Sequence, residues 1–178
     1  MATTLKNYLL SNLTAYYAPY ATTRPAAMVA YGAAWPVGWT KLGTNKEGST
    51  LSYSYDEYEL KTQESKGATI GVKRFNEQAM IKAVLAEFTH TNLILALNGK
   101  SVSSVAPGAS NGLEVLAVGG SACLPTYAWG FEGEGIDDEC QESFFTRIFF
   151  HKAVVSTGFE SEFKFDDYAG VPLSIKAL

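Results

Sequence analysis

Few residues in this chain are of the types that carry out catalysis or bind metals. The 178 residues include two histidines, His90 and His151, and two cysteines, Cys123 and Cys140. Glu87 precedes His90 by three positions, but a di-iron centre needs two such Glu-x-x-His units and further carboxylates from four helices. The cysteine spacing matches neither a zinc site nor a CxxC redox motif, so we expect both cysteines to be reduced and buried. The sequence therefore predicts no metal and no cofactor.

One short segment resembles the turn that carries a nucleophilic serine. Residues 119–123 read GGSAC, whereas the nucleophile elbow is G-x-S-x-G at a strand-to-helix turn. Cys123 occupies the position of the last glycine, and Pro125 follows it. The glycines that come next form neither a G-x-G-x-x-G nor a Walker motif. We therefore predict that the chain has no catalytic residues and is not an enzyme.

The most conspicuous group of titratable residues is acidic. Six carboxylates fall within residues 132–142 without a Lys or Arg among them: Glu132, Glu134, Asp137, Asp138, Glu139 and Glu142. The spacing does not fit an EF-hand, which needs alternating oxygen ligands, a central glycine and a terminal Glu. Two interpretations remain open. The segment is either an ordinary solvated loop or a patch that repels a polyanion.

Aromatic residues in predicted strands suggest an alternative function. Five of them could form a platform for sugars on a β scaffold: Tyr53, Tyr55, Tyr58, Tyr127 and Trp129. Alternating aromatics in strands more often belong to a core or an interface. A β-sandwich module that binds carbohydrate or protein is therefore kept as the alternative function.

Composition limits the class of protein. The chain is 47% hydrophobic and 18% charged, with a formal net charge of −4. These values favour one folded domain and argue against disorder and against a protein that holds nucleic acid by its phosphates. The N-terminal segment has no continuous apolar run, and prolines and glycines interrupt residues 25–40. We expect a soluble protein without a signal peptide or membrane insertion.

Hydrophobic patterning predicts a mainly β fold with one helix. Leu51, Tyr53 and Tyr55 alternate with polar residues, as in a half-buried strand. The polar run 57–67 predicts a long loop, and the next strand covers residues 68–75. Residues 77–98 fit either one continuous helix or a strand over 79–88 followed by a short helix. We favour the second, with Thr89 as the N-cap and Gly99 as the C′ glycine.

The remaining segments read as strands, preceded by an irregular arm. Residues 100–112 are rich in Ser, Gly and Pro and predict a loop. Further strands are predicted over residues 113–118, 126–132, 143–156, 159–165 and 171–178. Residues 1–50 show many turn formers and little periodicity. We therefore predict an antiparallel β-sandwich or barrel with one flanking helix, as a single domain over 35–178, preceded by an extended arm over 1–34.

Motifs spread along the chain resemble one family. Residues 35–51, WPVGWTKLGTNKEGSTL, resemble the major tail tube proteins of long-tailed, non-contractile bacteriophages. LAEFT at 85–89, with Asn-Leu at 92–93 and Ala-Leu at 96–97, is similar to the strand-to-helix junction of that family. Three later segments are similar to its closing strands: FHKAVV at 150–155, FDDY at 165–168 and GVPL at 170–173. The resemblance covers about residues 30–178.

The resemblance implies a structural virion protein. Members of the family fold as a β-sandwich with one flanking helix, form hexameric rings and stack the rings into a tube that conducts DNA. The implied partners are further copies of the chain, the tape measure protein, the tail terminator and the distal tail or baseplate proteins. DNA would pass without specific binding. The implied location is the virion tail, after assembly in the bacterial cytoplasm, and we expect no C-terminal immunoglobulin-like decoration domain.

Three groups of residues are predicted to serve assembly and DNA passage. The polar loop is expected to order against an adjacent ring through Glu57, Glu59, Lys61, Glu64 and Lys66. Trp35 and Trp39, on a segment interrupted by prolines, are expected to contact a neighbouring subunit. A bore lined by basic residues would retain DNA, so carboxylates are expected there. The candidates are Glu132, Glu134, Asp137 and Asp138, with Glu160 and Glu162 as the alternative.

Overall fold

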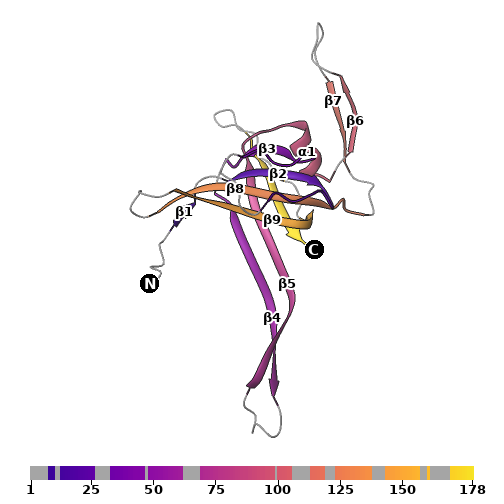
Figure 1. Cartoon of the computed structure of the whole chain (residues 1–178). Helices are drawn as coiled ribbons and strands as arrows, with labels where there is room; N and C mark the ends of the chain where they lie inside the picture. The colour runs from indigo at the N-terminus through magenta and orange to yellow at the C-terminus, as the bar shows by residue number, and fades with distance from the viewer. Residues whose placement is uncertain are drawn as a thin grey trace.

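The fold is mainly β, with one short helix (Figure 1). The computed structural model describes residues 8–10, 13–26, 33–46, 48–61, 69–98, 100–105, 113–118, 123–137, 143–156, 160 and 169–178. Within them lie ten strands and one helix: β1 (Tyr8–Leu10), β2 (Thr14–Pro19), β3 (Thr40–Thr44), β4 (Thr50–Lys61), β5 (Thr69–Leu85), α1 (His90–Ala96), β6 (Lys100–Val105), β7 (Leu113–Ala117), β8 (Tyr127–Asp137), β9 (Ser143–Val155) and β10 (Val171–Ala177). The predicted fold class is confirmed.

The main sheet curls until its end strand β3 meets β5. Its neighbours follow the order β3-β2-β8-β9-β10-β5-β4, all antiparallel, and β1 also pairs with β8. The end of β3 reaches β5 through two backbone hydrogen bonds: the Ala86 N–H donates to the Thr44 carbonyl at 2.8 Å, and the Lys46 N–H donates to the Val84 carbonyl at 2.7 Å. These bonds close strands β3, β2, β8, β9, β10 and β5 into a small barrel. Closure leaves few strand edges unpaired.

The core fills the inside of this barrel. Alternate residues of β5, β8 and β10 point inward, as the two-residue period of a strand requires. The largest fully buried side chains among them are Trp129, Phe131, Ile81, Leu85 and Ile175. No helix in the described ranges is long and apolar enough to span a membrane.

Helix α1 packs on the barrel, with Leu95 and Ala96 buried. The Thr89 side chain accepts a hydrogen bond from the Asn92 N–H at 3.2 Å, so the predicted N-cap is confirmed. Asn92 is itself buried, and its amide donates to the Leu42 carbonyl at 3.0 Å, which ties the helix to β3. The chain therefore forms a strand followed by a short helix, as predicted, and not one long helix.

The end of α1 differs from the prediction in one residue. Leu97 is the C-cap, and the next residue, Asn98, has φ of 49°, in the left-handed region. Asparagine tolerates this conformation better than most residues because its short polar side chain bonds locally. Asn98 therefore takes the place predicted for Gly99, which lies outside the described residues.

Two hairpins extend away from the barrel in opposite directions (Figure 1). One is the β6–β7 pair, which forms a separate two-stranded sheet. The other is the outer part of β4–β5: β10 pairs with β5 only between Met80 and Leu85, so among the described strands β4 alone pairs with residues 69–79. We call residues 53–61 and 69–79 the arm. It projects from the barrel without a core of its own.

The prediction that residues 1–34 form an extended N-terminal segment outside the domain is wrong for residues 13–19. Strand β2 lies inside the sheet between β3 and β8, and Leu13, Ala15 and Ala18 are buried. β3 likewise belongs to the barrel. Strand β2 lacks a clear polar alternation, and its partner residues on β8 are more than 100 positions away in the sequence. Local patterning therefore could not reveal it.

Truncation tests this correction. Removal of residues 1–26 deletes β1 and β2, so the Trp129 and Phe131 side of the core loses its neighbouring strand. We expect the shortened chain to be unfolded, as measured by the loss of the β signal in circular dichroism. Removal of residues 1–7 alone keeps every strand of the described residues and is the control. A cooperative melt of the 1–26 deletion would show that β2 is dispensable.

Two predicted loops contain strands. β4 continues to Lys61, so residues 57–61 are strand, and residues 62–68 lie outside the described residues. β6 occupies residues 100–105 of the other predicted loop. In both, charged or Ser-rich residues have low strand propensity, and pairing with the facing strand overrides it. The strand predicted over 159–165 lies outside the described residues, apart from residue 160.

Candidate assembly surfaces

The arm exposes an unusual amount of apolar surface. Every residue of β4 is exposed. Eight large hydrophobic side chains on β4 and β5 are between 37% and 60% exposed: Leu51, Tyr53, Tyr55, Tyr58, Leu60, Ile70, Val72 and Phe75. An isolated two-stranded hairpin is at best marginally stable in water, and contiguous exposed apolar surface marks interaction sites. The expectation that Leu51, Tyr53 and Tyr55 form a half-buried strand face is therefore wrong within this chain.

Two ion pairs lie at the outer part of the arm, one between the two strands and one within β4. Arg74 Nε lies 3.3 Å from Glu57 Oε1, and Lys61 Nζ lies 2.9 Å from Glu59 Oε2. Hydrogen bonds from Lys61 and Thr69 lower the pKa of Glu59 below its ordinary value. These groups are about half exposed, so each pair adds little stability. The cross-strand contacts among them, Arg74 with Glu57 and Thr69 with Glu59, are consistent with the observed register.

Near the barrel, the arm carries paired tyrosines. The Tyr53 and Tyr55 rings lie 5.7 Å apart, and the Arg74 guanidinium sits 4.2 Å from the Tyr55 ring centre. A side-chain hydrogen bond with Glu77 raises the pKa of Tyr53. The exposed rings are therefore held in place by charged neighbours on the same hairpin.

The inter-ring residues predicted from the sequence divide between two regions. Glu57, Glu59 and Lys61 lie on strand β4 and take part in the ion pairs just described, rather than on a loop. Glu64 and Lys66 lie outside the described residues. Contact of these side chains with another ring stays a prediction.

Trp35 and Trp39 form an aromatic layer on the outer face of the sheet. The Trp35 ring stacks on Tyr16 with centroids 4.2 Å apart, and Trp39 lies 4.8 Å from Trp35 and 5.5 Å from Phe149. Both tryptophans are half-buried. Their segment thus packs against its own chain, and contact with a neighbouring subunit stays a prediction.

Gly130 makes room for this layer. A Cβ atom at this position of β8 would clash with the Trp35 ring and would lie 3.3 Å from Trp39 Cζ3. The Trp35 indole can therefore approach the backbone of β8 this closely only because residue 130 has no side chain. The Trp39 indole N–H donates to the Thr23 carbonyl at 2.9 Å, which also fixes residues 22–26 on this face.

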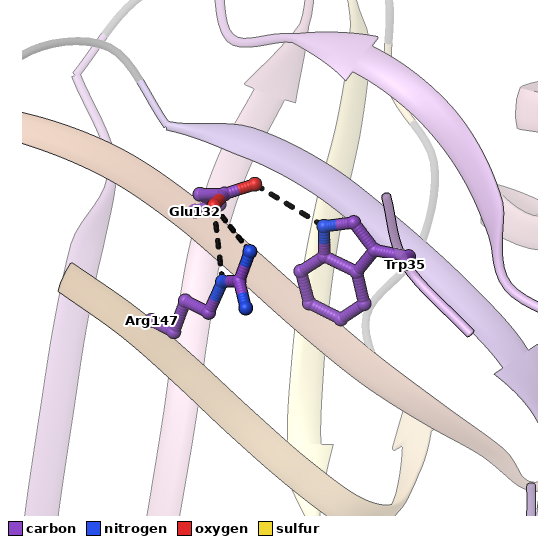
Figure 2. Close-up of polar contacts among 3 residues, drawn as sticks. All are labelled: Trp35, Glu132 and Arg147. Atoms are coloured by element: carbon purple, nitrogen blue, oxygen red, sulfur yellow. Dashed lines mark hydrogen bonds and ion pairs between the residues drawn. The ribbon is translucent and has the colours of Figure 1, made fainter. Parts of the chain in front are cut away.

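Glu132 forms a buried ionic cluster with Arg147 and Trp35 (Figure 2). Glu132 is only 3% exposed. Arg147 Nε and Nη2 donate to Glu132 Oε1 at 3.0 and 2.7 Å, and the Trp35 indole N–H donates to Oε2 at 3.1 Å. The guanidinium carbon lies 5.3 Å from the Trp35 ring centre. Both carboxylate oxygens are thus satisfied, as a buried charge requires.

The prediction that Glu132 faces a lumen is therefore wrong. β8 runs through Asp137, so residue 132 lies within a strand flanked by β2 and β9 rather than on a solvated loop. Glu134 is half-buried on the same strand, and Asp137 is its last residue. Asp138 lies outside the described residues. Glu160 is exposed and Glu162 is outside them, so a lumenal position of the other carboxylates stays a prediction.

The remaining candidates from the sequence do not converge on a site. Cys123 is exposed rather than buried, because it lies between β7 and β8 and not on a strand. Cys140 is outside the described residues. Among the described side chains, no three His, Cys, Asp or Glu residues gather to hold a metal ion. The five-residue aromatic platform is not formed, because Trp129 is fully buried in the core.

Comparisons with known proteins add no relative. No protein-family model matches the sequence, and no curated protein matches it. The features that bear on function are therefore those of the chain itself: the apolar arm, the aromatic layer and the closed barrel that carries both.

Proposed function

We propose that the chain is a structural subunit that assembles with copies of itself into a tube, as in the tail of a long-tailed, non-contractile bacteriophage. The observation that carries this proposal is the arm. Its large apolar side chains are exposed on a two-stranded ribbon that has no core. Such a ribbon gains stability when other protein covers it. The order of the motifs along residues 30–178 supports the family assignment.

The positions of the exposed surfaces favour head-to-tail assembly. The arm and the β6–β7 hairpin point away from each other (Figure 1), and Val115 and Val118, on and just after β7, are also exposed. A contact between two different surfaces of the same chain does not close as a dimer does. It generates rings or continuing filaments. Hexameric rings stacked into a tube, in the virion tail, are the assembly that the resemblance implies.

The charge of the chain suits a DNA conduit. Its net charge of −4 does not favour retention of a polyanion. We propose that DNA passes through without specific binding, with Glu134, Asp137 and Asp138 as the remaining candidates for the bore. The tape measure, tail terminator and distal tail or baseplate proteins are the proposed partners at the lumen and ends of the tube. No catalytic step and no cofactor are part of this function.

Negative-stain electron microscopy of the purified chain tests the proposal. Rings or tubes should form as the protein concentration rises, and light scattering should detect the same assembly in solution. A chain that keeps its β signal but stays monomeric at every concentration and salt condition would contradict it. Glycan binding by such a monomer would favour the alternative, a carbohydrate-binding module that uses the exposed Tyr53 and Tyr55 rings.

A further inference from the structure

We propose that the arm is clamped between two other copies of the chain, which contact it through two separate apolar patches on opposite faces of the ribbon. This inference rests on the proposed function and assigns its contacts to named residues. The inner patch consists of Tyr53 and Tyr55 on the arm and Leu51 just before it on β4. The outer patch consists of Tyr58, Leu60 and Phe75. Each patch serves a different neighbour.

The inner patch continues the core beyond the barrel. Leu51 pairs with Ile81 and Tyr53 pairs with Ala79, so these side chains share a face of the ribbon. Ile81 is completely buried in the core, whereas Leu51 and Tyr53 are more than half exposed. The apolar side chains on this face therefore form one continuous row. Residues of the same chain bury the part of the row inside the barrel and leave the part beyond it exposed.

The outer patch lies on the other face. β4 alternates without interruption, so Tyr58 and Leu60 point away from the side of Tyr53 and Tyr55. The register shifts between Ser54 and Asp56 because β5 contains one extra residue there. Beyond the shift, Phe75 pairs with Asp56 and thus joins the face of Tyr58.

At Asn76 the side chains of β5 change from one face of the ribbon to the other, relative to those of β4. Asn76 lies within the register shift and has φ of 53°, in the left-handed region. A bulge adds twist to a ribbon, so the two patches also face different directions along the arm. On the far side of each patch the ribbon is mostly polar: Ser52 and Ser54 lie behind the inner patch, and Glu57 and Glu59, with Val72 opposite Glu59, lie behind the outer patch. One flat partner surface cannot cover both patches.

Charge favours a second copy of the chain as the occupant on each face. The outer arm, residues 56–61 and 69–75, carries three acidic and three basic residues: Asp56, Glu57, Glu59, Lys61, Lys73 and Arg74. It is neutral overall, whereas the chain is acidic. An acidic copy can therefore approach the arm without net repulsion. Exposed apolar surface on other parts of the same chain, such as Tyr20 and Leu124, can meet it.

Distance from the barrel separates the two contacts. The inner patch begins at the barrel wall, so a copy lying beside the barrel covers it. The outer patch is centred five residues further along β4, which corresponds to about 17 Å of strand. A copy in the next layer of the assembly can reach it there. We therefore assign the inner patch to contacts within a ring and the outer patch to contacts between rings.

Paired variants test this assignment. Tyr53→Thr with Tyr55→Thr removes the inner patch, and Tyr58→Thr with Phe75→Thr removes the outer patch. Threonine preserves strand propensity, so both hairpins should still form. Sedimentation velocity and electron microscopy should show monomers for the inner variant and unstacked rings for the outer variant. Each variant should raise the protein concentration needed for its own step by at least about tenfold, because buried aromatic anchors dominate interface affinity.

A matched control lies on the face of the ribbon opposite the inner patch. Ser52→Ala with Ser54→Ala changes neither patch and is the control for both patch variants. This control should assemble as the unmodified chain does, and all three variants should keep its melting temperature.

Other outcomes overturn the clamp. Two patch variants that stop at the same stage, or that stop at the reversed stages, would contradict the assignment of separate contacts. Normal tubes from both patch variants would overturn the clamp while leaving self-assembly intact. An unmodified chain that never assembles would instead refute the proposed function itself, and the clamp with it.

Discussion

A chain whose arm is replaced by a short linker should fold as a stable monomer that forms no tubes. The change substitutes four Gly and Ser residues for residues 55–77, which include all of the arm except the two residue pairs at its base, and joins Ser54 to its cross-strand partner Gln78. The fully buried core side chains, Ile81 and Trp129 among them, are untouched, and the side chains of the removed residues on β4 are all exposed. We expect the melting temperature to change by no more than about 3 °C.

The measurement combines calorimetry with electron microscopy. A second variant separates the length of the arm from its apolar character: it keeps the hairpin but replaces the six residues of the inner and outer patches, together with Ile70 and Val72, with Thr. This variant should also fail to form tubes, because the hairpin would have no large apolar side chains left to bury. Normal tubes from the linker variant would remove the arm from the assembly contacts. A large fall in melting temperature would instead make the arm part of the subunit's own stability.

The sequence predicted which side chains of the arm share a face but not what covers them. Alternation from Leu51 to Tyr55 is a local property, and it correctly indicated a strand. Burial depends on whether another segment of the same chain packs on that face, which alternation does not show. The extension of β4 through Lys61 was missed for a related reason. Its charged residues are stabilised by partners such as Arg74, across the ribbon.

Local rules also explain where the helix was predicted well. The bond that caps α1 joins Thr89 to a residue three positions away, so it is visible in the sequence. Strand β2 shows the opposite case. Its backbone partners on β8 come from residues 127–132, and nothing near residues 14–19 reveals them. Elements held by distant pairing are the ones that single-sequence reasoning loses.

The same argument accounts for Glu132. A run of carboxylates without nearby Lys or Arg indicated solvent exposure, and the partners of Glu132 are 15 and 97 positions away in the sequence. Cross-strand pairing with Arg147 brings the counter-charge to it. Trp35 arrives from the segment that packs over Gly130. Neither contact has a signature in the acidic run itself.

Glu132→Gln should therefore lower the free energy of unfolding by about 3 kcal/mol, because it leaves the half-buried Arg147 without a charged partner. The Arg147 side chain is 20% exposed and that of Glu132 is 4% exposed, so solvent screens the pair only weakly. Arg147→Met should cost a similar amount, since the Glu132 carboxylate would keep only its hydrogen bond from Trp35. Urea denaturation of both single variants measures these losses.

The double variant Glu132→Gln with Arg147→Met gives the decisive comparison. When both charges are absent, neither is left buried and unpaired, so the loss should be smaller than the sum of the single losses by about 2 kcal/mol. Glu134→Gln is the control on the same strand, and it should change stability by less than about 0.5 kcal/mol. Strictly additive losses would show that the two side chains do not act as a pair. Stability unaffected by Glu132→Gln would return this carboxylate to the solvent-facing candidates for the bore.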